Sequence, residues 1–387
     1  MTLTLDGPAA ARSLREISQI EAAASESQRT ISTPLVDALW DSGLLSFLNT
    51  PEAGGCEPKF TEVIETWIEM AIQDGALGWI GIANMPSAMA ASAYLPDEGF
   101  QELFGNPLDR VTVGGQFFPN GSGESTGDGY MLSGSWNFGS GTAHSKYIAC
   151  GFFPVINGEA IFELTEIRAA LVPREQVQFT DGWHVQGLRG TGSYDYAVTE
   201  VFVPESRCFP LFTRQPKRGG SPLFRMGLMP ITAAGHAAWA LGVSKSMLDD
   251  VADLALKKAR MSDMETLALR NTFQRNLAHF TGMWRAARAG VIETFGSAER
   301  AVAAGEELTP RMRADMRVAA TYATEASREV GQWAHLAAGT TAIRDGSRME
   351  RAFRDLYTGT QHAFISEKTY IDAAQIWLGL EEDLPGI

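Results

Sequence analysis

The segment Gly134-Ser-Trp-Asn-Phe-Gly-Ser-Gly-Thr-Ala-His144 sets three glycines among aromatic and hydroxyl side chains. Glycine has no side chain beyond hydrogen, so a backbone rich in it can approach a flat ring closely. The aromatic residues of the segment can form walls beside such a ring. The alternative is a glycine-rich β-turn whose aromatic residues belong to the core. The segment therefore predicts either a slot for a planar ligand or a tight turn in a β domain.

The residues around this segment, 108–218, predict a small antiparallel β-barrel. Runs rich in β-forming residues are separated by turn signals such as Asn120-Gly121 and Asn157-Gly158. The clearest runs are Tyr130–Ser133, Tyr147–Phe153, Ala169–Val172 and Ala197–Val203. Glycine is frequent throughout this zone, in contrast to the zones on either side.

The two flanking zones predict helices. In residues 1–107, Thr33-Pro34 is a helix start, and helices are expected over Phe60–Ile72 and over roughly Leu77–Tyr94. In residues 219–387, apolar side chains from Leu269 to Val291 recur every three or four positions, and Thr309-Pro310 starts another long helix. The sequence predicts an α+β chain of three domains: an N-terminal helical domain, the barrel and a C-terminal four-helix bundle. A site is expected where the three meet.

Composition and motifs exclude several functions. The chain has 387 residues and a formal net charge of −14, which disfavours nucleic acid as a partner. Apolar runs are too short for a membrane span, and the N-terminus lacks a signal-peptide core, so a cytoplasmic location is expected. The three cysteines fit no zinc spacing, and no metal site is expected. Sequence motifs for nicotinamide dinucleotides, nucleoside triphosphates and serine hydrolases are absent as well.

Four blocks in register resemble the acyl-CoA dehydrogenase superfamily, and most of all its flavin-dependent monooxygenase branch. They are Pro51-Glu-Ala-Gly-Gly55, the opening segment, Gly187-Leu-Arg-Gly-Thr-Gly-Ser193 with Val201-Phe-Val-Pro204, and Phe353-Arg-Asp355 through His362. That branch includes oxygenase components that hydroxylate p-hydroxyphenylacetate and a secosteroid phenol. The family fold, helical domain then β-barrel then four-helix bundle, agrees with the three zones.

The resemblance implies a flavin beside Ser140. It implies cofactor contacts from the barrel at Phe117, Pro119, Gly121, Trp136, Phe138, Ser140, Arg189, Thr191 and Ser193. Relatives form tetramers built as dimers of dimers, so a homo-oligomer is expected. In that assembly Gly339 and Arg348 would approach the cofactor from the bundle side.

The resemblance also implies the catalytic residues. His362 matches the active-site histidine of the related hydroxylases, as a base or as a stabiliser of the flavin hydroperoxide, with Ser140 as the second catalytic residue. The substrate pocket is expected to include Asn84, Met85, His144 and Thr358. The other histidines, His184, His236, His279 and His335, are interpreted as structural.

Two departures from the family pattern bear on the reaction. Thr358 stands where acyl-CoA dehydrogenases often carry a glutamate base, and a hydroxyl is too weak a base to remove an α-proton. Ala83 and Pro86 stand where phenol hydroxylases carry histidines, so the substrate pocket is expected to differ from theirs.

The leading hypothesis is the oxygenase component of a two-component monooxygenase. A separate flavin reductase would supply reduced FMN or FAD, O2 would form the C4a-hydroperoxide, and one oxygen atom would enter an apolar or aromatic small molecule. The alternatives are an FAD-dependent acyl-CoA dehydrogenase, an amine N-oxygenase on the same fold, and a binding protein that has lost the flavin.

Overall fold

A computed structural model describes residues 4–259, 265–384 and 386–387. Its first helices are α1 (Gly7–Ser13), α2 (Arg15–Gln28), α3 (Thr33–Asp41), α4 (Phe60–Gln73), α5 (Gly75–Tyr94) and α6 (Asp97–Phe104). The strands are β1 (Val113–Ser125), β2 (Gly129–Gly139), β3 (Tyr147–Ile156), β4 (Glu159–Ala160), β5 (Arg168–Pro173), β6 (Gln178–Thr180), β7 (Tyr194–Pro204) and β8 (Cys208–Pro210). The last helices are α7 (Leu228–Lys257), α8 (Asn271–Ala303), α9 (Pro310–Ala338), α10 (Arg348–Gly359) and α11 (Glu367–Trp377). The helix–sheet–helix order confirms the expected α+β class.

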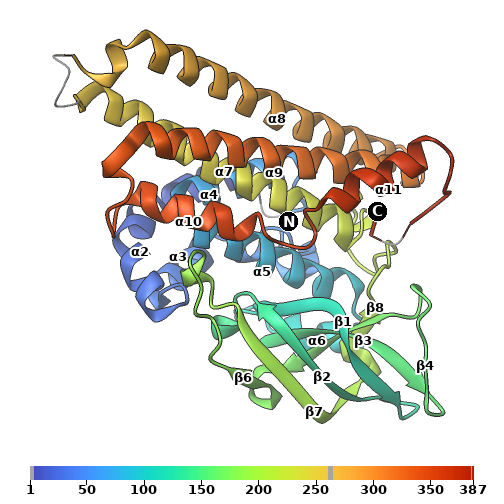
Figure 1. Ribbon diagram of the computed structural model, residues 1–387. Coiled ribbons are helices and arrows are strands. Elements are labelled where there is room, and N and C mark those ends of the chain that lie inside the picture. Colours follow the sequence, from blue (N-terminus) through green and yellow to red (C-terminus); the bar gives the residue numbers. More distant parts are fainter. Residues whose placement is uncertain (1–3, 260–264, 385) are drawn as a thin grey trace.

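Helix α5 runs between the other helices and the sheet (Figure 1). Asp74 caps its N-terminus, because its carboxylate accepts hydrogen bonds from the amides of Ala76 (2.9 Å) and Leu77 (3.2 Å). Its side chains are apolar around the whole circumference and nearly all are buried. A helix enclosed on every side is a rigid base, and residues of α5 contribute to everything described below.

The sheet corrects one expectation. The described strands follow the order β6-β7-β2-β1-β3-β5-β8, with β4 paired to β3, and the outermost strands β6 and β8 do not pair with each other. The β1–β3 pair is parallel, so the sheet is mixed rather than an all-antiparallel closed barrel. After β2 the chain crosses over the start of β1, so that β3 begins on the other side of β1 and runs parallel to it. Two bonds hold this crossover: Gly115 N donates to Ser140 O (3.3 Å), and Lys146 N donates to Thr112 O (3.0 Å).

The C-terminal helices form the expected bundle. Helices α7, α8, α9 and α10 pack together, and α11 packs on α9. Most of the apolar positions predicted for α8 face inward: Trp284 Nε1 donates to Leu241 O of α7 (2.9 Å), and Phe280 stacks on Trp333 of α9 at 5.0 Å between ring centroids. Leu269 does not, because it precedes α8 and is 60% exposed. Thr309 caps α9, as its sequence indicates.

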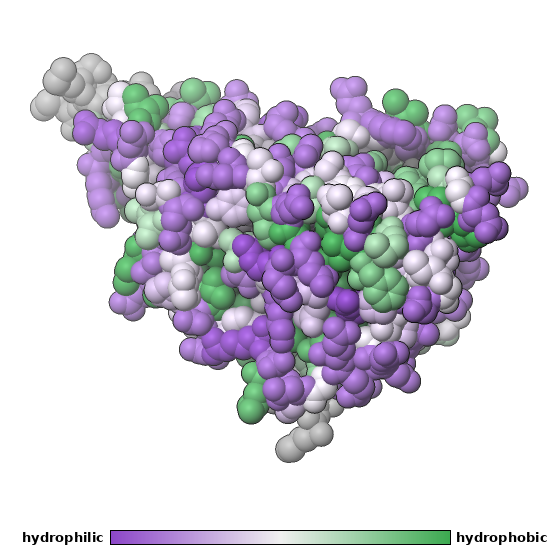
Figure 2. All heavy atoms as spheres, turned by 90° about the horizontal axis from the view of Figure 1, so that it is seen from below, coloured by the Kyte–Doolittle hydropathy of each residue, from purple (hydrophilic) through white to green (hydrophobic). Residues whose placement is uncertain are grey.

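Surface features agree with the composition. The face of the molecule seen in Figure 2 is largely hydrophilic, and its apolar side chains form small separate groups.

No helix in the described ranges is long and apolar enough to cross a membrane. Within the same ranges no cluster of His, Cys, Asp and Glu could hold a metal ion, and Cys56, Cys150 and Cys208 are free thiols.

The contact between α10 and the helices beneath it depends on a glycine. A Cβ on Gly359 would lie 2.1 Å from a ring carbon of Trp239 and 2.9 Å from one of Trp79. These two indoles meet edge to face at 5.0 Å, and Trp239 Nε1 donates to Gly75 O at 2.8 Å. The last turn of α10 therefore reaches α5 and α7 only because position 359 lacks a side chain.

We predict that Gly359→Ala lowers the free energy of unfolding by about 1–3 kcal/mol, since overpacking forces both indoles to move. Chemical denaturation followed by circular dichroism measures the change. Gly282→Ala in α8 is the matched control, because nothing lies within 4 Å of a Cβ at that position. There, alanine is expected to be neutral or to stabilise by up to about 1 kcal/mol. Equal stability of Gly359→Ala and the wild type would contradict this account of the packing.

Candidate active site

Three aromatic residues from three helical segments meet above the sheet. Trp79 comes from α5, His236 from α7, and His362 from the turn that follows α10. The ring centroids of His236 and His362 lie 4.3 Å apart, and Trp79 lies 5.3 Å from His236 and 6.0 Å from His362. His236, expected to be structural, packs its ring directly on that of the predicted catalytic His362.

His362 is a neutral imidazole with a defined proton position. Its Nδ1 accepts a hydrogen bond from Phe364 N (3.2 Å), so the proton of the neutral ring resides on Nε2. The residue keeps exposed surface, yet the surrounding protein and the nearby Arg317 guanidinium lower its pKa to about 4. His362 therefore offers a neutral N–H donor at the surface.

His236 is neutral as well. Complete burial lowers its pKa well below the usual value, and the neighbouring His362 and Arg317 lower it further. Arg317 also fixes the turn itself: it donates to Phe364 O (2.8 Å), and its guanidinium lies 3.4 Å from the Phe364 ring centroid. The positive charge of Arg317 thus opposes protonation of both His236 and His362.

A chain of hydroxyl groups leads from this cluster into the sheet. Trp79 Nε1 donates to Ser140 Oγ (2.9 Å), Ser140 Oγ lies 2.8 Å from Ser193 Oγ, and Ser193 Oγ lies 2.7 Å from Thr191 Oγ1. Thr191 Oγ1 donates in turn to Leu188 O (2.8 Å). Two of the recognised blocks are therefore joined directly by side-chain hydrogen bonds.

The β2–β3 crossover places Ser140 at the helix–sheet boundary. Gly141 follows it with a positive φ of 69°, and a Cβ there would lie 2.2 Å from Asn84 Oδ1 of α5. Gly141 N donates to Thr191 O at 3.0 Å. A glycine is needed at this position both for the backbone turn and for the close approach of α5.

Asn84 and His144 form a second polar pair beside the crossover. Asn84 Nδ2 donates to Val113 O (2.7 Å), so its Oδ1 is the acceptor for His144 Nε2, 3.1 Å away. Burial, aided by the charge of Arg174, lowers the pKa of His144 to about 4. The ring is therefore neutral with its proton on Nε2. Its Nδ1 is buried and accepts no hydrogen bond from the described residues.

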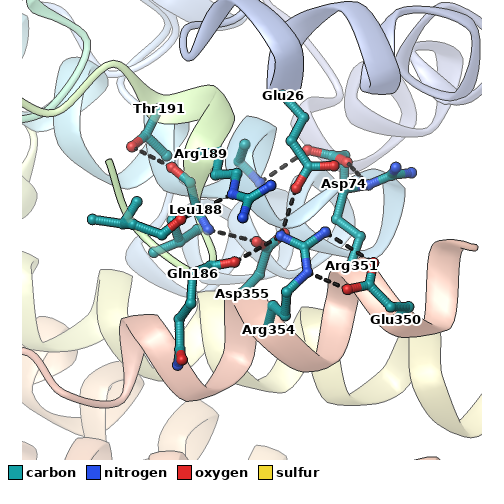
Figure 3. A network of polar contacts seen from close by, with 12 residues as sticks. Glu26, Asp74, Gln186, Leu188, Arg189, Thr191, Glu350, Arg351, Arg354 and Asp355 are labelled. Carbon is teal, nitrogen blue, oxygen red and sulfur yellow. Dashed lines mark hydrogen bonds and ion pairs between the residues drawn. The ribbon is translucent and has the colours of Figure 1, made fainter. Parts of the chain in front are cut away.

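Asp355 anchors the turn that carries Thr191 and Ser193. The carboxyl is buried, and its Oδ1 accepts a hydrogen bond from Leu188 N at 2.6 Å (Figure 3). Leu188 adopts a left-handed conformation with φ of 55°, unusual for a residue with a side chain. Its carbonyl accepts from Trp183 Nε1 (2.9 Å) as well as from Thr191. Bonds on both sides of Leu188 hold this conformation.

Charged groups from three helices surround Asp355. Arg354 pairs with Glu26 of α2 (2.5 Å) and with Glu350, and it donates to Gln186 O at 2.7 Å (Figure 3). Arg351 pairs with Asp74, the cap of α5, at 3.4 Å. Burial and the charge of Asp74 raise the pKa of Asp355 to about 7. This network ties α2, α5 and α10 to the turn that precedes β7.

Several predicted contacts are placed in the protein interior. Trp136 is completely buried in the sheet core, stacks on Tyr196 at 5.4 Å and donates to Phe118 O and Gly151 O. A Cβ on Gly121 would lie 2.6 Å from the Trp136 ring, and Met85 is buried in the main helical core. This placement corrects the expectation that these residues face a ligand, because they have no surface to offer one.

Three other predicted contacts lie in or beside β1 and β2. Phe117 is half-buried and packs toward Phe209 at 6.2 Å, and Pro119 follows it in a stretch where the β1–β3 register shifts. Phe138 is exposed, has a φ of 63°, and touches the edge of Trp183 at 6.2 Å. Of these aromatic side chains, only Phe138 is largely accessible to a ligand.

The remaining predicted residues divide by location. Thr358 lies on α10 one turn before His362, and its buried hydroxyl accepts and donates no bond among the described residues. Arg189 is exposed and donates to Val185 O (2.9 Å). Arg348 begins α10 and pairs with Asp250 (2.6 Å), while Gly339 precedes that helix. At 1.5 Å per residue, Arg348 lies about 20 Å from His362, so one chain does not bring them together.

The sequence does not single out Trp79 and His236, whose rings the structure places beside His362. Neither lies in a block that signals a ligand: Trp79 sits in an alanine-rich apolar run, and His236 is alone among apolar residues of α7. Only the approach of three separate helical segments reveals them.

The donors and acceptors beside Trp79 fit the polar edge of a flavin ring. The Ser140 residue is 8% exposed, and His362 offers a neutral N–H donor. Trp79 connects the two with an aromatic ring. A polar ring edge needs hydrogen-bonding groups of this kind, held by a rigid scaffold and set in an apolar surround.

Comparisons with known proteins define the class. The family model described as acyl-CoA dehydrogenase, C-terminal domain, matches residues 234–367. An indole-3-acetate monooxygenase from Pseudomonas putida is 30% identical over 367 residues, covering 93% of this chain and 90% of that protein. The oxygenase subunit HsaA of a flavin-dependent monooxygenase from Mycobacterium tuberculosis is 26% identical over 364 residues, covering 88% and 87%. XiaF from Streptomyces sp., solved with FADH2 and glycerol, shares the fold with a TM-score of 0.90 at 22% identity over 98% of this chain and 97% of that chain.

The chain belongs to the flavin-dependent monooxygenases that are built on the acyl-CoA dehydrogenase fold. It is the oxygenase component of such an enzyme and uses reduced flavin and O2. These findings favour the monooxygenase over the alternative acyl-CoA dehydrogenase, in agreement with Thr358 at the place of a carboxylate base.

The raised pKa of Asp355 gives a prediction about stability. A free aspartate titrates near 4, so between about pH 4 and pH 7 the folded chain retains a proton that the unfolded chain has released. Stability is therefore lost as pH rises through this window. Asp355→Asn carries no charge, and its Tm relative to the wild type should rise from pH 5 to pH 7 and stay constant above pH 7.

Differential scanning calorimetry at several pH values measures this difference. The control is Asp41→Asn, an exposed side chain paired with Arg110 on the surface, which should show no comparable rise. Parallel Tm curves for Asp355→Asn and the wild type across the whole range would contradict the assignment.

Proposed function

We propose that Ser140, Trp79 and His362 line a recess that holds the reactive part of the reduced flavin, and that the substrate lies on the His144 side of this recess. The observation that carries the proposal is the convergence of a hydroxyl from the sheet and an imidazole from the C-terminal helices on one indole of α5. When bound, the reduced flavin supplies two electrons to O2, so that one oxygen atom enters the substrate and the other leaves as water.

His362 acts as a hydrogen-bond donor to the oxygen being transferred. Its Nδ1 is engaged with Phe364 N, which leaves the Nε2–H for a ligand. A base would need a free nitrogen lone pair, so between the two roles expected from the resemblance the donor role fits better. With a pKa near 4 the ring stays neutral, and its donor is present, throughout the range from pH 6 to pH 8.

Asn84 fixes the His144 ring, which is partly exposed and forms one side of the proposed substrate position. Asn84 and the Nδ1 atom of His144 are themselves buried and contact no ligand. Indole-3-acetate is the first substrate to test, because the Pseudomonas putida relative is named for it. A related hydroxylase is named for the phenol resorcinol, so a phenol is the second.

We predict that the reduced flavin bound to the protein reoxidises with O2 in at least two phases, more slowly than free flavin. With indole-3-acetate or another accepted aromatic present, hydroxylated product should form. In His362→Ala, product per flavin oxidised should fall about 100-fold and hydrogen peroxide should replace it, because a positioned donor is lost. Stopped-flow absorbance and product analysis by mass spectrometry measure both effects.

His279→Ala is the matched control, since His279 lies exposed on α8. It should behave as the wild type does. Single-phase reoxidation at the rate of free flavin in the wild type, with no product from any aromatic tested, would refute the proposed function.

We also propose a tetrameric assembly, a dimer of dimers. Large apolar side chains are exposed on the C-terminal helices and the turns beside them, among them Leu336, Ile343, Ile371, Trp377, Leu378 and Leu380. Burying such side chains between subunits is favourable. Gly339 and Arg348, distant from His362 within one chain, would then reach a neighbouring subunit's cofactor. Light scattering should give about four times the 41.9 kDa of one chain, and a monomer would overturn the proposal.

A further inference from the structure

The two ends of the hydroxyl chain fix the direction of every hydrogen bond in it. An indole N–H can only donate, and a backbone carbonyl can only accept, whereas each hydroxyl has one proton. Thr191 uses its proton on Leu188 O, so Ser193 must donate to Thr191. Ser193 has then used its own proton, so Ser140 must donate to Ser193.

Ser140 is left as an acceptor toward any ligand. Its proton points to Ser193, and one of its two lone pairs accepts from Trp79 Nε1. One lone pair remains. The Ser140 residue is 8% exposed, whereas Ser193 is 2% and Thr191 0% exposed, so Ser140 is the member of the chain that can touch a ligand.

The opposite order of donation, from Thr191 to Ser193 and from Ser193 to Ser140, is strongly disfavoured. It would take the Thr191 proton away from Leu188 O, so that two oxygen lone pairs would face each other across 2.8 Å, while the carbonyl itself would keep its bonds from Trp183 Nε1 and Thr191 N. The acceptor end is also held in place, since Asp355 and Trp183 fix Leu188 from two sides. The direction is therefore a property of the fold and is present before any ligand arrives.

We infer that Thr191 and Ser193 are positioning residues that hold Ser140 as an obligate hydrogen-bond acceptor and thereby make the site prefer reduced flavin over oxidised flavin. This inference rests on the proposed function of the recess. The reduced isoalloxazine bears an N–H at its N5 position, which matches the free lone pair of Ser140. The oxidised ring has a lone pair at the same nitrogen, and two facing lone pairs repel.

Such a preference suits an oxygenase component. Its flavin arrives reduced from another protein and must leave oxidised after each turnover. When the ring N–H is lost at the end of the reaction, its favourable contact with Ser140 is replaced by an unfavourable one. The same serine thus contributes to capture of the reduced flavin and to release of the oxidised product.

The test is Thr191→Val, which has nearly the same shape and no hydroxyl. Leu188 O keeps its bond from Trp183 Nε1, so the variant leaves that carbonyl paired. Ser193 loses its acceptor and can turn, which frees Ser140 to donate toward a ligand. Ser193→Ala removes the acceptor of the Ser140 proton directly and should act in the same direction. Thr191→Ser is the matched control because it retains the hydroxyl.

The Kd values of reduced and oxidised FMN and FAD are measured by anaerobic fluorescence titration, with the Tm of each variant recorded beside them. In the wild type, the reduced form of the accepted flavin should bind more tightly. The ratio of oxidised to reduced Kd should fall about tenfold in Thr191→Val and in Ser193→Ala, and stay near the wild-type ratio in Thr191→Ser.

The possible failures are distinguishable. If the wild type binds neither redox form, the proposed function of the recess is wrong. If the wild type binds both forms equally, the inference is wrong while the flavin site stands. A folded Thr191→Val or Ser193→Ala protein with the wild-type ratio would overturn the inference as well.

Discussion

The hydrogen bond from the Leu188 amide to the buried Asp355 carboxyl, 2.6 Å long, joins two parts of the molecule that are 167 residues apart in the chain. On one side is the turn before β7, with Thr191 and Ser193. On the other is α10, which leads to His362. Because Leu188 is held in a left-handed conformation, its carbonyl faces Thr191 and ends the hydroxyl chain. The position of Ser140 and the position of His362 thus depend on the same contact.

Burial of the Asp355 carboxyl is unfavourable in free energy, but its contacts hold several elements in place. Burying a carboxyl near Asp74 is unfavourable, as the raised pKa of Asp355 records. The arginines of α10 are largely engaged with Glu26, Glu350 and Asp74. In exchange, α2, α5, α10 and the β7 turn are fixed relative to one another. Sites that must hold a ring within a fraction of an ångström need supports of this kind.

Much of the fold was predictable because its signals are local. The cap of α9 at Thr309, the apolar circumference of α5 and the turn at Asn157-Gly158 each follow from neighbouring residues. The parallel β1–β3 pair was not predictable, since it depends on which edge of β1 receives the next strand. Ser140 and His362 were predicted from the family resemblance. Trp79 and His236 were missed, and Trp136 was misplaced, because burial and contacts between distant helices leave no mark in a short stretch of sequence.

In the proposed site, Ser140 and His362 bind the same flavin ring. A crystal structure of the protein with the reduced flavin, prepared without oxygen, tests it most directly. We expect the isoalloxazine in the recess beside Trp79, with N5 within hydrogen-bonding distance of Ser140 Oγ and His362 Nε2 facing the ring from the other side. Flavin bound elsewhere on the chain, or bound in the recess with neither residue in contact, would contradict the account.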